Sequence, residues 1–223
     1  MDKPALAIMT RVPSPEGKSR LGELLTPEQR EDLQWVFLLE AIKKTRRLPG
    51  FKCFVAATPP EQIEKLGHLP GCGRLEIIPQ PAGDLGRRMM TVARQLHRRG
   101  YKPVILIGTD TPELPPEFIL EAAQLLQRHH LVLGPSFDGG YYLIGLSAPE
   151  DRVFQGISWG TGSVLEQTLS ICHQNKLTYY LLEPLRDIDR PDDLRALAGE
   201  NRQRALEQHP LPAKIREFLA NLT

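Results

Sequence analysis

The sequence has few cysteines, few aromatic residues and almost no excess charge. Its three cysteines, Cys53, Cys72 and Cys172, are scattered without a C-x-x-C pair, which argues against a disulfide framework or a structural zinc site. Aromatic residues make up 6% of the chain, and the formal net charge is +1. A nearly neutral chain has no basic excess to attract nucleic acid or a membrane surface, so neither is an expected partner.

Long hydrophobic runs are also missing. The first apolar run, Ala5 to Met9, ends at Arg11 and two prolines, so it does not have the form of a signal peptide. No other run approaches the length of a membrane-spanning helix. The apolar content of 41% and the charged content of 25% are ordinary for a globular protein. These features predict a soluble, cytoplasmic protein.

Strand-like and helix-like segments alternate along the chain. Apolar runs typical of strands occupy residues 5–9, 52–58, 75–79, 103–108, 131–134, 141–146 and 177–183. Helical patterns occupy residues 26–44, 61–66, 83–100, 117–130, 162–175, 187–200 and 212–222. Alternation with short loops predicts an α/β fold of three layers, with a mainly parallel central sheet and helices on both faces. Residues 141–146 are candidates for an antiparallel strand, and the absence of a linker or repeat predicts one domain over residues 1–223.

Two helix starts carry capping signals. Thr26 with Gln29 has the spacing of a capping box, and Pro27 suits the first helical position. Ser163 with Glu166 has the same spacing. We expect a capping box at each of these helix starts.

Charged residues follow the predicted strands. Ligands of open α/β sheets bind beyond the carboxyl ends of the strands. The cations Arg11, Lys18 and Arg20 follow the first strand, and carboxylates follow several later ones. A phosphate-bearing ligand with a hard divalent metal needs both kinds of group at one edge of the sheet.

The loop after the first strand contains Gly17-Lys18-Ser19, the final residues of a P-loop pattern. The P-loop fingerprint needs glycine where Val12 stands, and Pro13 and Pro15 lack amide donors that cradle phosphate. These departures argue against a P-loop NTPase. The side chains of Lys18 and Arg20 remain candidates for binding phosphate, and the alternative is a solvated basic loop.

The segment GTDTPELP, residues 108–115, places a carboxylate just after a strand without polar residues. Burying such a group costs several kcal/mol unless a cation meets it. Asp110 is therefore a candidate ligand for Mg²⁺ or Mn²⁺. The alternative is that Asp110 caps the turn that follows it.

The stretch LVLGPSFDGGYYLIGL, residues 131–146, has a carboxylate and two glycines at its centre. Asp138 with Gly139 between strand-forming residues is a hairpin signal, and the same residues also suit a backbone approached by a ligand. In DIDRPDDL, Asp189 suits the N-cap of a helix and leaves Asp187 less well explained. The WGTG segment that begins at Trp159 is either a mobile flap or the glycine-rich start of a helix.

Six motifs in order resemble those of a known family. They are PSPEGKSRL, QPAGDLGRRM, GTDTPELP, LGPSFDGGYYLIGL, ISWGT and DIDRPDDL. In this order they are similar to a bacterial family of GT-A-like glycosyltransferases, associated with radical-SAM/selenodomain proteins, of the nucleotide-diphospho-sugar transferase superfamily. A more distant similarity extends to guanylyltransferases that act on molybdenum cofactor and on phospholactate. The resemblance covers the chain from Ala5 to about Leu197.

The resemblance implies a set of site residues. Lys18 and Arg20 would contact phosphates beside the catalytic metal, and Asp110 would bind that metal, Mg²⁺ or Mn²⁺, with Asp187 or Asp189 completing its shell. The residues implied to bind nucleotide or acceptor are Arg11, Asp84, Arg88, Thr109, Asp138, Gly139, Gly140 and Trp159. Two departures from the family pattern are the shorter spacing between Gly17 and Lys18 and a glycine where the family has serine after Trp159.

The sequence thus predicts a metal-dependent transferase with a nucleotide or nucleotide-sugar donor and a small-molecule acceptor. The family resemblance favours glycosyl transfer, which we place slightly ahead. Two cations after the first strand suit a triphosphate and favour nucleotidyl transfer with release of pyrophosphate. The third alternative is a nucleotide-binding protein that has lost catalysis, which the altered first loop favours.

Overall fold

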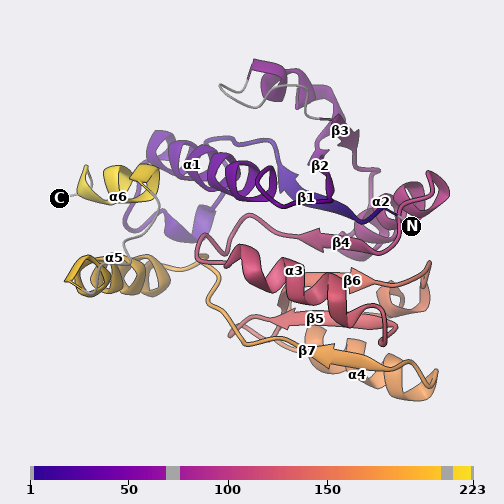
Figure 1. Cartoon of the computed structure of the whole chain (residues 1–223). Helices are drawn as coiled ribbons and strands as arrows, with labels where there is room; N and C mark the ends of the chain where they lie inside the picture. The colour runs from indigo at the N-terminus through magenta and orange to yellow at the C-terminus, as the bar shows by residue number, and fades with distance from the viewer. Residues whose placement is uncertain (1–2, 69–75, 207–212, 222–223) are drawn as a thin grey trace.

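The computed structural model describes residues 3–68, 76–206 and 213–221, and a seven-stranded sheet runs through them (Figure 1). The strand order is β3-β2-β1-β4-β6-β5-β7. β6 runs antiparallel to β4 and β5, and every other pairing is parallel, as predicted. The strands are β1 Ala5–Arg11, β2 Lys52–Thr58, β3 Glu76–Pro79, β4 Val104–Ile107, β5 Leu131–Pro135, β6 Tyr141–Leu146 and β7 Tyr179–Leu181.

Helices cover both faces of the sheet and complete the three-layer α/β architecture. The α-helices are α1 Pro27–Thr45, α2 Leu85–Arg98, α3 Pro116–Leu125, α4 Val164–Gln174, α5 Pro191–Leu206 and α6 Ala213–Ala220. Short 3₁₀ helices are η1 Ser19–Leu21, η2 Pro60–His68 and η3 Arg152–Phe154. Buried side chains of α2 and α4 share one core cluster, and those of α1 and α3 share another. The predicted fold class is therefore confirmed.

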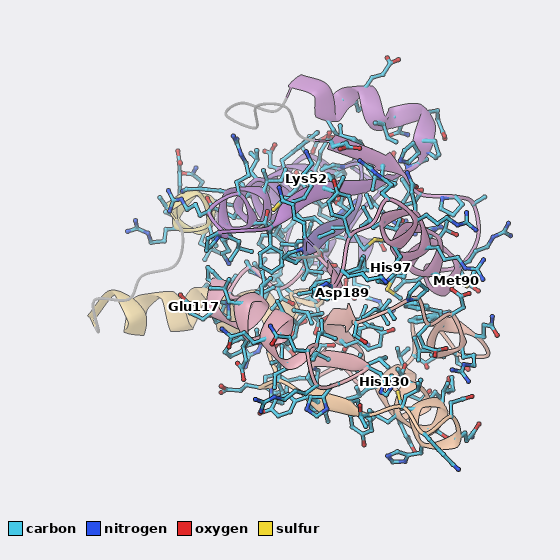
Figure 2. All side chains as sticks on the ribbon, turned by 45° about the vertical axis from the view of Figure 1, so that its right-hand side comes forward. Lys52, Met90, His97, Glu117, His130 and Asp189 are labelled. Carbon is cyan, nitrogen blue, oxygen red and sulfur yellow. The ribbon has the colours of Figure 1, made fainter. Side chains whose placement is uncertain are left out.

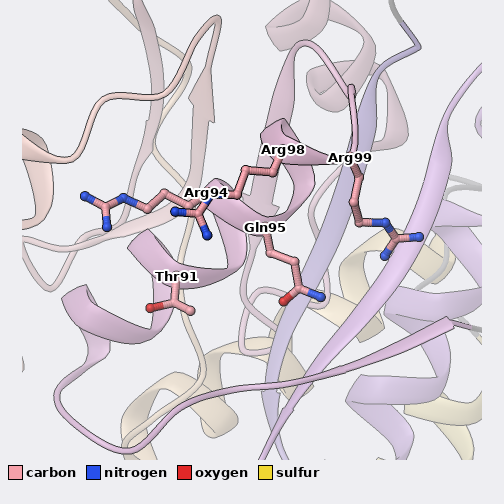
Figure 3. A pocket seen from close by; sticks show the side chains of 5 residues that line it. All are labelled: Thr91, Arg94, Gln95, Arg98 and Arg99. Atoms are coloured by element: carbon pink, nitrogen blue, oxygen red, sulfur yellow. The ribbon is translucent and has the colours of Figure 1, made fainter.

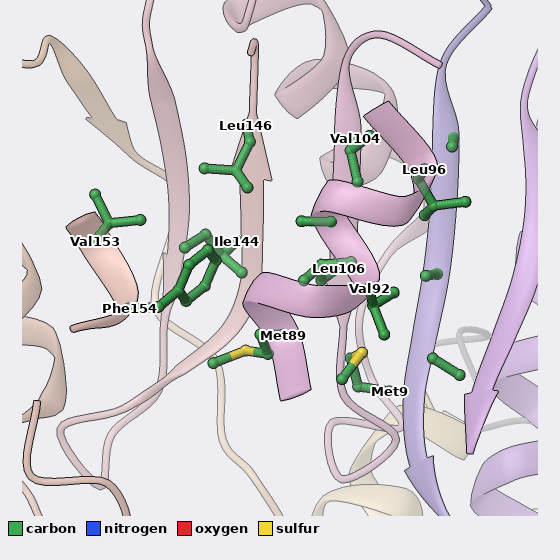
Figure 4. Close-up of a cluster of buried hydrophobic side chains, with 14 of the residues drawn as sticks. Met9, Met89, Val92, Leu96, Val104, Leu106, Ile144, Leu146, Val153 and Phe154 are labelled. Atoms are coloured by element: carbon green, nitrogen blue, oxygen red, sulfur yellow. The ribbon is translucent and has the colours of Figure 1, made fainter. Parts of the chain in front are cut away.

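Helix α2 packs its apolar face on the strands at the centre of the sheet. Met89, Val92 and Leu96 recur at helical spacing and are buried against Leu106 of β4 and Ile144 of β6 (Figure 4). Each such side chain contributes about 1.5–3 kcal/mol when it is fully buried. All four residues of β4 are buried, because helices pack on both of its faces.

One of the two predicted capping boxes forms. Thr26 accepts from the Gln29 amide, and the Gln29 side chain accepts from the Thr26 amide. The prediction for Ser163 is wrong, because its hydroxyl contacts Thr161 and the Gln167 side chain. The amide of Leu165 instead donates to the carbonyl of Gly139, 2.9 Å away. A tertiary contact thus replaces the local cap at the start of α4.

The last two helices pack on α1 and η1. A third core cluster joins Leu21 and Phe37 to Leu194, Leu197 and Ile215. This packing draws the chain after β7 back toward the loop after β1. In Figure 1, α5 and α6 lie at the left, beside the start of α1.

Some of the predicted features cannot be compared with the structure. Cys72 and the ends of the predicted segments 75–79 and 212–222 lie outside the described residues. The assignment of residues 1–223 to one domain stays a prediction. Among the described residues, no helix is both long and apolar enough to span a bilayer.

Candidate active site

The loop after β1 is held by side chains of α1. Arg30 donates from Nε to the carbonyl of Gly17 at 3.2 Å and from a terminal nitrogen to that of Pro15 at 2.8 Å. Gln34 donates to the carbonyl of Ser14 at 2.8 Å. Side chains of α1 therefore hold the loop by donating to the loop's carbonyl groups. Proline keeps its carbonyl, so Pro13 and Pro15 are compatible with this arrangement.

Lys18 lies at the centre of the site. Its side chain is 6% exposed, and Nζ is 3.0 Å from Oδ1 of Asp110 and 3.8 Å from Oδ1 of Asp189. Nζ also donates to the carbonyl of Ile188 at 2.5 Å. The structure thus brings together three residues that are far apart in sequence. They meet just beyond the carboxyl ends of β1 and β4, where the two strands run parallel.

The second oxygen of Asp189 binds Arg20 at 2.5 Å, so this carboxylate bridges two cations. The alternative role of Asp189 as the N-cap of α5 is not what the structure shows. Oδ2 of Asp193 accepts from the amides of Asp189 and Arg190 at 3.2 and 2.7 Å. Capping by Asp193 leaves Asp189 available to the cations.

Asp110 is positioned by backbone pairing. Its carbonyl accepts from the amide of Ile188 at 2.8 Å, and Thr109 donates to its carboxylate at 3.3 Å. The turn that follows is closed by the amide of Leu114 and the carbonyl of Thr111, so it does not depend on the Asp110 carboxylate. The Asp110 side chain is 50% exposed, which leaves part of it open to a ligand.

Asp187 is half-buried beside other carboxylates. Burial raises its pKa to about 6, the nearby charges of Asp138 and Asp193 add to this rise, and Lys18 opposes it. A second cation at this point would relieve the repulsion among the carboxylates.

Asp138 sits in the β5–β6 turn, and the hairpin interpretation describes that turn well. Its Oδ1 accepts from the Ser136 hydroxyl at 2.5 Å and from the Gly140 amide at 2.9 Å. Gly139 has φ +88°, and a Cβ there would lie 2.0 Å from the carbonyl oxygen of Gly162. The turn is therefore locked against the start of α4.

The Trp159 ring is packed at one side of this turn. A Cβ on Gly86 would lie 2.3 Å from the indole nitrogen, so the ring lies directly on α2. Its other contact is edge-on to Tyr141, with ring centroids 6.3 Å apart. These contacts favour the interpretation of the WGTG segment as the start of a helix over that of a free flap.

Three further predicted residues lie outside the Lys18 cluster. The Asp84 carboxylate caps α2 by accepting from the Arg87 amide at 2.7 Å. Arg88 is half-buried, and its Nε has no hydrogen-bond partner among the described residues. Arg11 ends β1 as an exposed residue. Their roles in ligand binding stay predictions.

Gln80 shapes the site, although the sequence patterns did not predict it. Gln80 is 3% exposed and donates to the carbonyls of Thr10 and Ala56 at 3.0 and 2.6 Å, which ties the ends of β1 and β2 together. Its place in the QPAGDLG motif, directly after a strand, was a usable signal.

Lys44 was missed as well. It donates from α1 to the carbonyls of Pro112 and Leu114, in the loop that follows Asp110. Burial lowers the pKa of Lys44 to about 8, and the charges of Glu40 and Glu113 oppose this shift. The signal for it is a lysine in the apolar face of α1.

The fit of a metal depends on what else is bound. Within the described parts of the chain, no group of three His, Cys, Asp or Glu side chains is arranged to hold a metal. Magnesium is often held by one or two carboxylates together with substrate phosphates. The half-exposed Asp110 and the crowded Asp187 fit an ion that arrives with phosphate, and they do not form a complete cage.

Two hollows in the surface, of about 470 and 540 Å³, lie along α2 and not over the Lys18 cluster (Figure 3). The two hollows and the cluster of charged side chains around Lys18 therefore lie in different parts of the molecule. We place the candidate active site at the cluster that contains Asp189 (labelled in Figure 2), because a buried ammonium meets two partly exposed carboxylates there, at the carboxyl ends of parallel strands.

Residues 41–161, more than half of the chain, match the family model described as "uncharacterized protein conserved in bacteria (DUF2064)". The chain belongs to this family. The narrower radical-SAM-associated group stays a prediction for this DUF2064 protein.

Three relatives of this DUF2064 protein inform its fold and class. The 2-phospho-L-lactate guanylyltransferase of Methanocaldococcus infernus is 25% identical over 182 residues, covering 79% of this chain and 76% of the relative. A crystal structure from Desulfovibrio desulfuricans G20, provisionally described as a nucleotide-diphospho-sugar transferase, has a TM-score of 0.88 at 27% identity and covers 100% and 99% of the two chains. A CMP:2-keto-3-deoxy-manno-octonic acid synthetase complexed with CTP has a TM-score of 0.53 at 15% identity, covers 93% and 99%, and supports the fold alone. These likenesses confirm the α/β fold and the prediction of a transferase.

Proposed function

We propose that this DUF2064 protein is a nucleotidyltransferase that joins a nucleoside monophosphate to an anionic acceptor and releases pyrophosphate. The observation that carries the proposal is the buried ammonium of Lys18 between Asp110 and Asp189, at the carboxyl ends of β1 and β4. The guanylyltransferase relative supports the same reaction class. Its name suggests a phosphorylated 2-hydroxy acid as the first acceptor to test.

The charges of the site explain why nucleotide and metal would bind together. Two cations, Lys18 and Arg20, face the carboxylates of Asp110, Asp187 and Asp189. A polyphosphate entering alone would meet an excess of negative charge. A divalent ion held by Asp110 and Asp187 would reverse this balance and neutralise charge on the phosphates when bound.

Lys18 and Arg20 would act on the leaving group. In nucleotidyl transfer, an acceptor oxygen forms a bond to the α-phosphorus while the bond from that phosphorus to the bridging oxygen of pyrophosphate breaks. The electron pair of the broken bond goes to pyrophosphate, which gains negative charge. Preorganised cations stabilise such charge as it develops. Lys18 is preorganised, because its Nζ is already held by Ile188 and Asp110.

A second candidate is glycosyl transfer from a nucleotide sugar. The observation that favours it is the likeness to the Desulfovibrio desulfuricans structure over the whole chain. The same residues would bind the diphosphate, but the bond broken would be the one between the sugar carbon and the diphosphate oxygen. The sugar and the acceptor stay predictions.

A thermal-shift panel separates these candidates. The four nucleoside triphosphates and their common sugar diphosphates are each tested with Mn²⁺ and with EDTA. Stabilisation by a triphosphate that requires Mn²⁺, followed by pyrophosphate release with a phosphorylated 2-hydroxy acid, supports nucleotidyl transfer. Stabilisation by nucleotide sugars alone supports glycosyl transfer. Binding without turnover by either ligand class favours the catalytically inactive alternative, and no stabilisation at all contradicts the proposal, since a ligand of the folded state must stabilise it.

A further inference from the structure

A basic groove lies at the opposite end of the sheet from the candidate active site. It has a volume of about 540 Å³ and is lined by Arg94, His97, Arg98, Lys102 and Pro149. The amide of Lys102 donates to the carbonyl of Lys3, just before β1 begins. The groove therefore sits at the amino ends of the parallel strands, where Figure 1 shows the N-terminus beside α2.

Cations outnumber carboxylates in this groove. Arg94 binds both oxygens of Asp151 at 2.8 Å from Nε, which neutralises one charge. Arg98 and Lys102 have no ion-pair partner in the part of the chain that the structure describes. Three cations against one carboxylate leave an excess of about two positive charges, which matches a dianion.

The neighbouring hollow extends the basic surface along α2. Its lining comprises Thr91, Arg94, Gln95, Arg98 and Arg99. Figure 3 shows the guanidinium groups of Arg94 and Arg98 on the same side of the helix, with Arg99 directed away from them. Arg99 is paired with Glu76 at 2.6 Å, so Arg94 and Arg98 are the arginines that the two hollows share.

His97 adds a specific feature to the groove. The residue is 7% exposed (Figure 2 labels it on α2), and Nδ1 lies 3.1 Å from the carbonyl of Tyr101. Because a carbonyl only accepts, Nδ1 carries a hydrogen. Nε2 is buried and has no hydrogen-bond partner among the described residues. Burial lowers the pKa of His97, and the charge of Lys102 lowers it further, so the ring is neutral at neutral pH and Nε2 is an unsatisfied acceptor.

We infer that this groove binds an inorganic oxyanion that still carries an acidic proton, namely orthophosphate or diphosphate. Arg94, Arg98 and Lys102 neutralise the anion. The His97 ring lines the same groove, and a small movement of the side chains around it lets the buried Nε2 accept from the O–H of the anion. Sulfate has the same charge as hydrogen phosphate but no hydrogen to donate. A phosphate monoester is also mostly without an O–H above its second pKa of about 6. The groove therefore discriminates by a hydrogen bond as well as by charge.

Two other occupants fit the groove less well. Its lining contains no Phe, Tyr or Trp, and its one ring, His97, is 7% exposed, so it lacks the stacking surface of a single-stranded nucleic-acid site. The exposed large apolar residues of the described chain lie elsewhere, so the groove lacks the apolar anchor of a membrane-binding face. They are Leu24, Leu85, Phe137, Tyr180 and Leu181.

The test is a titration of the full chain with sodium phosphate and with sodium sulfate, in EDTA at about pH 7.5, followed by calorimetry. We expect phosphate to bind at least about tenfold more tightly than sulfate, which is the usual effect of one lost hydrogen bond in a buried site. Arg98→Gln should weaken phosphate binding by about tenfold, since charge-assisted hydrogen bonds are the strong ones. The matched control is Arg128→Gln, which removes one exposed arginine after α3 on the other face of the sheet and should leave phosphate binding unchanged.

His97→Phe tests the hydrogen bond separately. It should make phosphate and sulfate bind equally well, with thermal unfolding used to check that the variant is folded. If it is not folded, sulfate binding by the parent is measured as the pH falls through the pKa of His97. Because protonated His97 donates to sulfate, sulfate affinity should then rise toward that of phosphate.

Three results overturn the inference. The first is equal binding of phosphate and sulfate by the parent at neutral pH, and the second is an unchanged affinity of Arg98→Gln for phosphate. The third is phosphate binding that disappears in Arg20→Gln and survives in Arg98→Gln. The last result would place the anion at the candidate active site. The inference does not depend on the proposed function, because EDTA removes the metal that the proposed nucleotide site requires.

Discussion

The two ends of the sheet carry opposite balances of charge. At the carboxyl ends, the ammonium of Lys18 is enclosed by Asp110, Asp189 and the carbonyl of Ile188. At the amino ends, Arg98 and Lys102 have no carboxylate partner among the described residues. The positive charge of Lys18 is therefore paired within the protein, whereas within the described residues the positive charges of Arg98 and Lys102 are not.

This difference separates two kinds of anion binding. An anion can enter the groove on α2 alone, because the charge that it meets is positive. At the carboxyl ends, Asp110, Asp187 and Asp189 oppose an anion that comes without a cation. Metal dependence should therefore distinguish the two sites.

Asp110→Asn should give the largest effect. A nucleotide at about 100 times its dissociation constant stabilises the folded parent by about 2.7 kcal/mol. The variant should lose the part of this stabilisation that requires Mn²⁺, because Asp110 is the half-exposed carboxylate of the site. Its phosphate binding in EDTA should be unchanged. Thermal shifts with and without Mn²⁺ measure both, and Asp192→Asn, on an exposed carboxylate, is the control. A variant that responds like the parent would show that the metal assignment is wrong.

Gly139→Ala should destabilise the protein by about 2 kcal/mol, within the range for backbone strain at such positions. A Cβ would lie 2.0 Å from the carbonyl oxygen of Gly162, at a residue with φ +88°. Urea unfolding measures the loss. Gly50→Ala is a matched control, because Gly50 has φ +80° and nothing within 4 Å of its Cβ position. Equal losses in the two variants would mean that the contact with Gly162 adds nothing to the strain of the positive φ.

Lys18→Met should change metal and nucleotide binding in opposite directions. Without the ammonium, Asp110 and Asp189 lose a cation, so free Mn²⁺ should bind about tenfold more tightly. The nucleotide with Mn²⁺ should bind about tenfold less tightly, through loss of a charge-assisted hydrogen bond. Electron paramagnetic resonance of Mn²⁺ measures the first effect. The control is Lys43→Met, which removes an exposed lysine of α1. A decrease in both affinities would contradict the expectation that the Lys18 ammonium competes with Mn²⁺ for Asp110.

Sequence patterns were sufficient for most of the fold. The unbroken apolar run of β4 and the turn at Asp138 and Gly139 are local signals, and the structure contains both the buried strand and the hairpin. The meeting of Lys18 with Asp110 also follows from topology, since carboxyl ends of adjacent parallel strands share one edge. These predictions needed only strand type and order.

The parts that sequence did not predict depend on packing between distant elements. Lys18 bonds a carbonyl 170 positions away, at Ile188, because α5 and α6 pack on α1. At the start of α4, the Ser163 hydroxyl contacts Thr161 and Gln167, and the Leu165 amide donates to the carbonyl of Gly139 in the hairpin turn. Lys44 reaches from α1 to the loop after Asp110. No local spacing encodes such partners, because the distance between them is set by how the helices lie on the sheet.

Lys44 gives an effect of a different kind, a dependence of stability on pH. Burial lowers the pKa of Lys44 to about 8 in the folded state, whereas an exposed lysine in the unfolded chain titrates near 10.4. Between these values the unfolded state binds more protons, so the free energy of unfolding should rise with pH in this window, by at most about 1.4 kcal/mol per pH unit. Below about pH 8 the charged, desolvated ammonium costs stability, and its bonds to Pro112 and Leu114 offset part of that cost.

The measurement for Lys44 is the difference in free energy of unfolding between the parent and Lys44→Met, from urea titrations at about pH 7.5 to 9.5. Taking the difference removes the contributions of other groups that titrate in this range, such as the cysteines. Parallel curves for the two proteins would show that Lys44 keeps an ordinary pKa. The variant should also weaken metal-dependent nucleotide binding, because Lys44 fixes the loop that follows Asp110, and it should leave phosphate binding in the α2 groove unchanged. A change at both ends of the sheet would mean that Lys44 acts on the stability of the whole fold and not on the candidate active site.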